Sequence, residues 1–222
     1  MTTVLFVHGL ESGPRGKKAL ALEEAGFKVV SGQMPCSRRA VLQDPAVIAL
    51  IVLALGILIA ASMQGALGFM ITLIAYSVLF RFVQPLLMRR VFRRSVAVQL
   101  ELLGANQIDA VVGSSFGGAV ALELLVSGAW KGPTLLLCPA HRKVAGRAWR
   151  PTPRLPAEAS KVLVVHGRQD ETVPIDDSRS LVRGTSVKLI EVEDGHRLAA
   201  TATPDRFKEW ISSLLEGSKQ SS

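Results

Sequence analysis

The sequence of 222 residues is poor in cysteine and in aromatic side chains. Its two cysteines, Cys36 and Cys138, are too few for a disulfide framework, and they form no cluster of metal ligands. Because Cys138 ends the apolar run TLLLC, we expect it to be buried in a strand. Aromatic residues make up only 5% of the chain, although 49% of it is hydrophobic and the mean hydropathy is +0.33. The surplus is therefore aliphatic, and we expect it to be concentrated in one region.

A secretory signal is also lacking. The N-terminal stretch MTTVLFVHG has neither the charged region nor the long apolar region of a signal peptide, so we expect the catalytic part to be cytoplasmic. The net charge is +8 and the pI is near 10, which favours nucleic acid, acidic lipid or the cytoplasmic flank of a membrane segment. No nucleic-acid partner is expected, because the basic residues have no aromatic platform or recognisable binding module.

Short apolar runs alternate with helical patterns along most of the chain. The expected strands are TVLFVHG, FKVVSG, IDAVVGSS, PTLLLCP, KVLVVHG and SVKLIEVEDG. The expected helices between and after them are RGKKALALEEAG, residues 91–103, FGGAVALELLVSG, residues 174–183 and PDRFKEWISSLLEG. Nearly continuous apolar strands that alternate with helices are typical of a parallel sheet covered on both faces. The sequence therefore predicts an α/β fold with a mostly parallel sheet of about six strands.

Two segments interrupt this alternation, an uncharged run and a basic, proline-rich segment at residues 140–156. We therefore expect the α/β unit to be divided into a first part at residues 1–40 and a second part at residues 95–217. A hydrophobic helical hairpin at residues 41–94 would separate the two parts, and residues 218–222 would form a flexible tail.

The stretch VVGSSFGG contains a G-x-S-x-G pattern with Ser115 at its centre. An apolar strand precedes it and a helical pattern follows, so the serine would occupy a tight strand-to-helix turn above the sheet. The helix that begins at Phe116 would direct its N–H groups and the positive end of its dipole toward the site. Taken alone, the pattern also fits a Gly/Ser turn without chemistry.

A nucleophilic serine needs a base, and the base needs an orienting acid. Asp170 follows a strand by a short loop and is the candidate acid, with helix capping as its alternative role. Asp176 and Asp177 are rival acids, but they fall in an expected helix and should be solvated. His196 is the candidate base because it alone completes the chain order serine, aspartate, histidine.

The remaining histidines are less suitable, since His8 and His166 end strands and His141 precedes every candidate acid. The oxyanion of an acyl-transfer reaction also needs two backbone N–H donors. One would come from Phe116, and the other from the loop HGLESGP, most simply from Leu10.

With these residues, the sequence resembles the α/β-hydrolases, in particular small bacterial esterase-like members that begin with F-x-H-G-x-x-S-x-P. The matching residues are Phe6, His8, Gly9, Ser12 and Pro14. The resemblance covers residues 2–35 and about 95–216. The extra N-terminal strands usual in the family are absent, and the hydrophobic insertion is not expected in its soluble members, which puts the usual substrate pocket in doubt.

The resemblance implies a serine hydrolase that cleaves carboxylic ester or thioester bonds through an acyl-enzyme, without metal or cofactor. Ser115 would be the nucleophile, Asp170 the orienting acid and His196 the base. The substrate would be a small molecule or a lipid acyl ester. The alternative is a binding or scaffold module that keeps the hydrolase fold, is attached to a membrane and does no catalysis.

No charged residue occurs from Pro45 to Phe80. A helix rises about 1.5 Å per residue and a bilayer core is about 30 Å thick, so a span needs about 20 residues. Residues 45–63 nearly suffice, and the second half suffices if it continues to Met88, with Arg81 reaching the interface and Pro85 kinking its final turn. We therefore expect residues 45–88 to contact membrane lipids.

Arginines flank this run on both sides, which predicts that both ends of the hairpin are cytoplasmic. They are Arg38, Arg39, Arg89, Arg90, Arg93 and Arg94. Two alternatives stay open, a helical cap over the active site and an oligomer formed through the apolar surface. A soluble cap should show charges on its outer face, which this run lacks. Under either alternative the protein would be simply cytoplasmic. The basic segment 140–156 would lie near anionic headgroups or form a solvated loop.

Overall fold

The computed structural model describes residues 1–10, 12–63, 65–156, 159 and 161–219. In chain order its elements are β1 (Thr3–Val7), α1 (Lys17–Glu24), β2 (Lys28–Val30), α2 (Arg38–Leu42), α3 (Pro45–Ser62), α4 (Gly65–Ala105), β3 (Ala110–Ser114), α5 (Phe116–Val126), β4 (Thr134–Leu137), α6 (His141–Arg147), β5 (Val162–Gly167), α7 (Ile175–Val182), β6 (Lys188–Val192) and α8 (Pro204–Lys219).

The six strands form one sheet in the order β2-β1-β3-β4-β5-β6, and every neighbouring pair is parallel. This confirms the predicted α/β class and the predicted number of strands. The direction in which the chain adds strands reverses between β1 and β3. Ligands of open α/β sheets bind beyond the carboxyl ends of the strands at such a reversal. The loop that contains Leu10 and the turn that contains Ser115 both leave the sheet there.

Two hydrophobic layers cover the sheet, one on each face. In β1, Leu5 and Val7 belong to the layer formed with α4, α5, α6 and α7, whereas Val4 and Phe6 belong to the layer formed with α1 and α8. Successive strand residues point to opposite faces, so a strand buried on both sides must be apolar at every position. This explains the uninterrupted apolar runs in the sequence.

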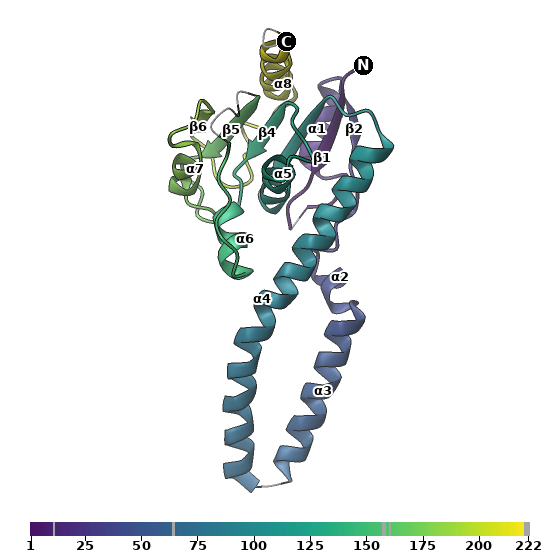
Figure 1. Ribbon diagram of the computed structural model, residues 1–222, viewed down its shortest axis with the longest axis vertical. Helices are drawn as coiled ribbons and strands as arrows, with labels where there is room; N and C mark the ends of the chain where they lie inside the picture. Colours follow the sequence, from purple (N-terminus) through teal and green to yellow (C-terminus); the bar gives the residue numbers. More distant parts are fainter. Residues whose placement is uncertain (11, 64, 157–158, 160, 220–222) are drawn as a thin grey trace.

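The helices α3 and α4 form a hairpin that extends away from the sheet (Figure 1). Asp44 caps α3 by accepting a hydrogen bond from the N–H of Ala46 at 2.9 Å, and Pro45 occupies the first helical position, where its missing N–H costs nothing. The carboxylate of Asp44 also pairs with Arg90 and Arg94 of α4. Cap and ion pairs together fix the base of the hairpin.

The predicted domain boundary at residue 94 falls inside α4, a single helix of 41 residues that runs from the hairpin into the α/β unit. Pro85 lies inside this helix rather than in its final turn. The C-terminal half of α4 buries Phe92, Ser95 and Gln99, and this packing lets the helix continue where the sequence suggested a change of domain.

The basic segment 140–156 is not a loop throughout, because α6 occupies its first half. Val144 and Ala145 of α6 are buried, and the prolines that suggested a loop begin only at Pro151. Asp177 is also different from the prediction. It is buried rather than solvated, and it lies 3.6 Å from the guanidinium of Arg142.

The predicted tail at residues 218–222 overlaps the end of α8, which continues to Lys219, and residues 220–222 lie outside the described residues. The helix is stabilised by an apolar face that includes Phe207, Trp210 and Ile211. Gly217 does not end it, since a single glycine inside a helix costs only about 1 kcal/mol.

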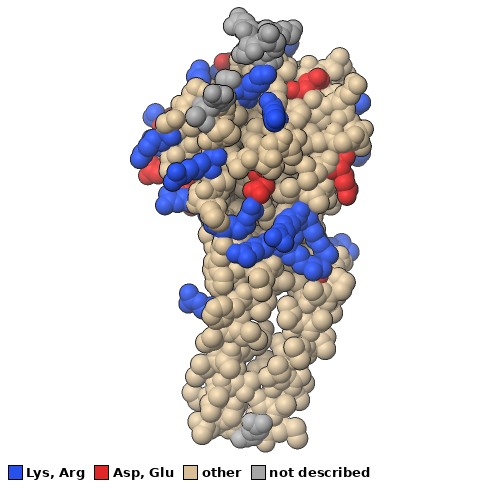
Figure 2. Space-filling view, viewed as in Figure 1, with Lys and Arg blue, Asp and Glu red and all other residues tan. Residues whose placement is uncertain are grey.

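Charge and apolar surface are sharply divided between the two parts of the molecule. Figure 2 shows lysine and arginine side chains gathered where the hairpin joins the α/β unit, while the hairpin beyond them is almost free of charge. Its exposed side chains are large and aliphatic or aromatic, among them Ile51, Leu53, Ile59, Met70, Ile74, Val78 and Phe82. The predicted concentration of aliphatic residues in one region is confirmed.

Gly117 in the first turn of α5 provides a test of this packing. A Cβ atom there would lie 2.0 Å from the carbonyl oxygen of Val7, so we expect Gly117→Ala to destabilise the fold by at least about 2 kcal/mol. Gly146→Ala in α6 is the control, since nothing lies within 4 Å of its added Cβ and alanine is the better helix former. Thermal unfolding in detergent measures both, and an unchanged transition for Gly117→Ala would contradict the packing described.

Candidate active site

Ser115 occupies a strained turn between β3 and α5, with φ 55° and ψ −116°. Only small neighbours allow this turn, because a Cβ at Gly113 would lie 2.7 Å from the carbonyl oxygen of Gly117. The Ser115 N–H donates a hydrogen bond to the carbonyl of Leu137 at 2.9 Å, which ties the turn to β4. Non-glycine residues with positive φ are uncommon, and strain of this kind concentrates at functional sites.

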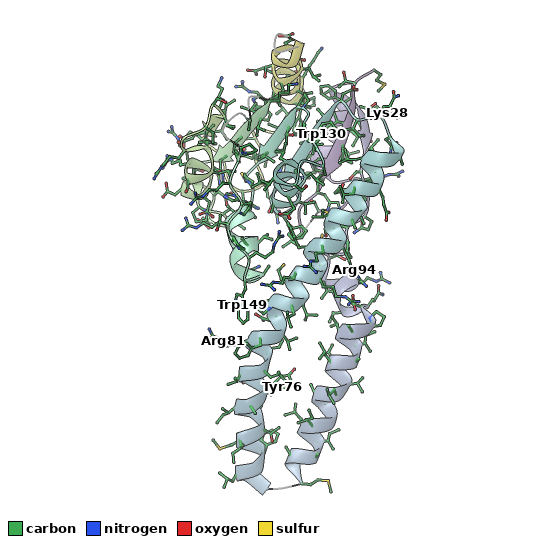
Figure 3. The ribbon with its side chains drawn as sticks, in the orientation of Figure 1. Lys28, Tyr76, Arg81, Arg94, Trp130 and Trp149 are labelled. Atoms are coloured by element: carbon green, nitrogen blue, oxygen red, sulfur yellow. The ribbon has the colours of Figure 1, made fainter. Side chains whose placement is uncertain are left out.

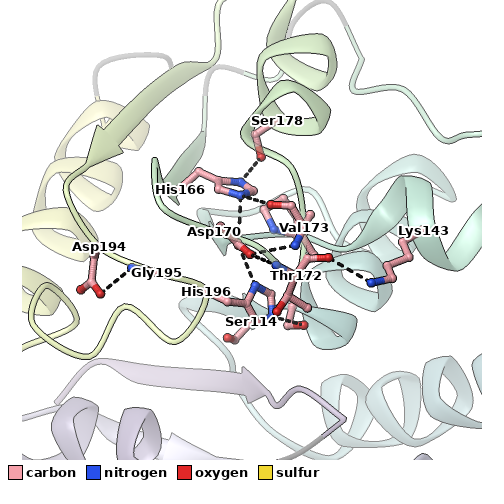
Figure 4. Close-up of polar contacts among 12 residues, drawn as sticks. Ser114, Lys143, His166, Asp170, Thr172, Val173, Ser178, Asp194, Gly195 and His196 are labelled. Atoms are coloured by element: carbon pink, nitrogen blue, oxygen red, sulfur yellow. Dashed lines mark hydrogen bonds and ion pairs between the residues drawn. The ribbon is translucent and has the colours of Figure 1, made fainter.

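The structure brings together the three residues that the sequence predicted as nucleophile, acid and base. His196 Nε2 lies 2.8 Å from Ser115 Oγ, and His196 Nδ1 lies 2.6 Å from Asp170 Oδ2. Because the carboxylate can only accept, Nδ1 carries the proton in the neutral ring, and Nε2 is left to accept from the serine hydroxyl. The bond between His196 and Asp170 is drawn in Figure 4.

The carboxylate of Asp170 is fully buried, and protein groups supply its hydrogen bonds. Its Oδ1 accepts hydrogen bonds from the N–H groups of Thr172 at 2.8 Å and Val173 at 2.7 Å. Burial alone would raise its pKa, but these bonds and the one from His196 outweigh that effect and hold the pKa of Asp170 below its ordinary value. The acid is therefore ionised and held in one orientation.

His166 contacts the same carboxylate, which the sequence did not indicate. Its Nε2 lies 3.2 Å from Asp170 Oδ2 and 2.9 Å from the carbonyl oxygen of Val173, and its Nδ1 lies 2.7 Å from Ser178 Oγ (Figure 4). Both partners of Nε2 are acceptors, so a neutral ring with its proton on Nε2 satisfies every contact. The ring is structural, as expected, but it also fixes the position of the acid. The only available signal was the spacing of four residues between His166 and Asp170.

The loop that carries His196 is closed by Asp194. Asp194 Oδ2 accepts hydrogen bonds from the N–H groups of Ala200 and Thr201, both at 2.9 Å, and Oδ1 accepts from Gly195 N–H at 2.7 Å. This loop crosses the end of β5 so closely that a Cβ at Gly167 would lie 2.2 Å from the carbonyl oxygen of Asp194. The base therefore depends on a rigid loop.

The two predicted oxyanion donors come from segments next to Ser115. Phe116 is the first residue of α5, where helical N–H groups have no partner within the helix. The loop that contains Leu10 passes the nucleophile closely, since a Cβ at Gly9 would lie 3.3 Å from the Cβ of Ser115. Ser12 Oγ accepts a hydrogen bond from the Gly9 N–H at 3.1 Å and curls this loop. The roles of Leu10 and Phe116 stay predictions.

The other two histidines are buried and do not contact Ser115. The ring of His8 bonds the carbonyl of Gly9 at 2.8 Å and the N–H of Met34 at 3.3 Å. His141 lies against the carbonyl of Pro139 at 3.1 Å, and burial lowers its pKa. Both act within the local backbone structure.

One group of potential metal ligands in the described part of the chain lies beside the acid, formed by Cys138, His166 and Asp170. It does not fit a metal. Burial raises the pKa of the Cys138 thiol to about 12, which disfavours the thiolate that a metal requires. Both ring nitrogens of His166 and both oxygens of Asp170 are already engaged in hydrogen bonds.

Lys18 is a second, partly buried charge near the site, and it too was not expected. Its ammonium donates a hydrogen bond to Ser114 Oγ at 3.2 Å, and burial lowers its pKa. The nearby carboxylates of Asp170 and Asp194 oppose this effect. Lys18 therefore supplies positive charge near the two carboxylates of the acid and base loops.

In sequence, no model of a protein family matches the chain, and no curated protein matches it. Solved structures are similar in fold. A candidate hydrolase of the alpha/beta superfamily from Xanthomonas campestris pv. campestris aligns with a TM-score of 0.59 at 20% identity, over 97% of this chain and 99% of that one.

Two further structures give the same result. An alpha/beta hydrolase enzyme from the metagenome of sediments of the lagoon of Mar Chica, Morocco, aligns with a TM-score of 0.56 at 13% identity, over 98% of this chain and 92% of that one. A candidate hydrolase from Agrobacterium vitis S4 aligns with a TM-score of 0.53 at 17% identity, over 96% of this chain and 88% of that one. The sheet order, the serine turn and these alignments agree that the chain has the α/β-hydrolase fold.

Proposed function

We propose that this protein is a serine hydrolase that cleaves carboxylic ester or thioester bonds and is anchored to the membrane by residues 45–88. The observation that carries the catalytic part is the unbroken series of hydrogen bonds from Ser115 through His196 to Asp170. A serine, a base and an orienting acid in this arrangement are the parts that acyl transfer needs.

The reaction follows from the proton positions. Ser115 Oγ attacks the carbonyl carbon of the substrate while its proton moves to His196 Nε2. The imidazolium is stabilised by the ionised Asp170 and then gives this proton to the departing alcohol or thiol, which leaves an acyl group on Ser115. Water, deprotonated by His196, attacks the acyl carbon, and the carboxylic acid and the free serine are released.

The negative oxygen of each tetrahedral intermediate needs N–H donors in a fixed position. We assign these to the backbones of Phe116 and Leu10, which flank the nucleophile from α5 and from the loop after β1. The positive end of the α5 dipole acts in the same direction. No cofactor is needed for any of these steps.

The hairpin supports the membrane part of the proposal. Only 17% of the residues in α3, and 0% of those in the most apolar 18-residue window of α4, are buried. A cap would bury its apolar side chains on the enzyme, yet Figure 1 shows the hairpin pointing away from the sheet. The 18 residues of α3 extend about 27 Å, close to the thickness of a bilayer core.

The same arrangement supports a substrate that is a lipid or another amphiphilic acyl ester. The helices α2 and α6, which follow the carboxyl ends of β2 and β4, lie on the side of the sheet from which the hairpin extends (Figure 1). Ser115 follows the carboxyl end of β3 and therefore lies on that side as well. With both ends of the hairpin cytoplasmic, the site would face the inner membrane surface.

The nucleophile is tested with a fluorophosphonate probe on the purified full-length protein. We expect Ser115→Ala to abolish labelling, because within the described residues no other hydroxyl is bonded to His196. Ser127→Ala, at the other end of α5, is the control and should label like wild type. Equal labelling of wild type and Ser115→Ala would exclude this nucleophile, and a folded wild type that never labels would favour a non-catalytic scaffold.

The acid is tested by comparing Asp170→Asn with Asp176→Asn, its exposed rival. The amide of Asp170→Asn can donate to Nδ1 and so favours the wrong ring tautomer, and we expect kcat for a p-nitrophenyl ester to fall by the order of 10³ or more. Asp176→Asn should stay near wild type. Equal kcat values for the two variants would contradict the assignment.

The lowered pKa of Asp170 also means that its ionised carboxylate stabilises the fold above about pH 3.9. This contribution to the free energy of unfolding is lost as the pH falls further.

Membrane attachment is tested by washing cell membranes with alkaline carbonate, and we expect the wild type to stay in the pellet. Two arginines in the hairpin, Leu53→Arg with Ile74→Arg, replace side chains that are 60% and 62% exposed. They should release protein, because a charge at the bilayer centre costs about 3 kcal/mol or more.

Leu20→Arg, at a leucine of α1 that is 47% exposed, is the matched control and should stay in the pellet. Release of the wild type into the supernatant would defeat the anchoring proposal. Oligomers in that supernatant would identify a second copy of the chain as what covers the hairpin.

A further inference from the structure

A cavity of about 320 Å³ lies between α4, α5 and the segment that follows α6. Its lining residues are Arg89, Phe92, Arg93, Val96, Glu123 and Arg150. Neither Ser115 nor His196 lines it, so the cavity is separate from the hydrogen-bonded series at the candidate active site. Its volume is at the lower end of the range of small-molecule sites.

One wall of the cavity is a fixed ion pair. The guanidinium of Arg150 donates to Glu123 Oε1 at 2.6 Å and lies 4.9 Å from the centre of the Phe92 ring. The carboxylate neutralises one positive charge, and the ring holds the guanidinium in place from the other side. Arg150 is therefore positioned before any ligand arrives.

The other two arginines that line the cavity keep their positive charge. Arg89 donates to the carbonyl oxygens of Ala148 and Trp149, both at 2.6 Å, and carbonyl groups orient a guanidinium without cancelling its charge. Within the described part of the chain, Arg93 makes no hydrogen bond or ion pair. Three guanidinium groups and one carboxylate leave a formal charge of +2 around the cavity.

The position of the cavity suggests what this charge binds. It opens at the base of the hairpin, where Arg90 and Arg94 hold Asp44. In Figure 3, Trp149 and Arg94 mark this level, and the apolar part of the hairpin begins just beyond it. Trp149 is 55% exposed, and its ring lies edge-on to that of Phe82 with 5.7 Å between the centroids. Tryptophan is enriched at the boundary between headgroups and hydrocarbon.

We propose that this cavity binds the phosphate group of an anionic phospholipid whose acyl chains lie along the exposed apolar side of α4. Guanidinium groups bind phosphate through paired, charge-assisted hydrogen bonds, and Arg89 and Arg93 present two such groups from successive turns of one helix. A zwitterionic headgroup would leave the surplus charge uncompensated. The lipid part of this inference rests on the membrane attachment proposed above.

The test uses the full-length protein in maltoside micelles, with tryptophan fluorescence and native mass spectrometry as readouts. Three probes are titrated separately, namely dioctanoyl phosphatidylglycerol, dioctanoyl phosphatidylcholine and inorganic phosphate. We expect saturable binding of phosphatidylglycerol. The Kd of Arg93→Gln should be about tenfold higher than that of the wild type, because one charged contact is lost.

Arg147→Gln is the matched control. It removes the same charge from exposed α6, next to the cavity but not in its lining, and should bind like wild type. Arg89→Gln provides a second cavity variant. Unchanged circular dichroism and thermal unfolding of each variant show that it is folded.

Equal affinity of wild type and Arg93→Gln, or equal binding of phosphatidylcholine, would overturn the proposal. If inorganic phosphate binds as tightly and displaces the lipid, the cavity is a site for a soluble phosphate and the lipid part is wrong. These outcomes do not depend on carbonate extraction or on labelling of Ser115. A failure here is therefore distinguishable from a failure of the proposed function.

Discussion

The close approach of the first turn of α5 to the end of β1 determines the rest of this structure. At Gly117 a single added carbon would overlap the carbonyl of Val7, so the helix touches the strand without any side chain between them. Ser115, the residue just before α5, has a positive φ of 55° and lies at the edge of the sheet. The loop after β1 is brought to the same point, because β1 and β3 are neighbours.

The charges at this edge follow a related constraint. A carboxylate is costly to bury unless it is hydrogen-bonded, and Asp170 meets that requirement with backbone N–H groups and two imidazoles. These bonds favour the ionised form of Asp170 next to His196, whose side chain is only partly exposed. In the neighbouring loop the partly exposed carboxylate of Asp194 also accepts hydrogen bonds mainly from backbone N–H groups. Stability of the two loops and orientation of the imidazole are thus achieved by the same bonds.

The sheet and the three residues of the candidate site could be predicted from the sequence, because each is marked by a short local pattern. Continuous apolar strands, a serine between glycines at a strand end, and the chain order of Ser115, Asp170 and His196 leave few other arrangements. What could not be predicted depends on contacts between distant segments. His166 reaches Asp170 only because α7 places Ser178 on its other side, and α6 forms because Val144 finds a buried position. The continuity of α4 depends on Phe92, which packs against Phe116 in a helix remote in sequence.

The unbroken course of α4 has a mechanical consequence. A helix of 41 residues is about 60 Å long, and although Pro85 lies inside it, the helix continues from its apolar end to the end that packs on the sheet. A domain joined to an anchor by a loose tether can tumble, whereas under the proposed anchoring a continuous helix would restrict the height and tilt of the α/β unit above the membrane. The approach of a substrate to the sheet edge is then set by geometry rather than by chance reorientation.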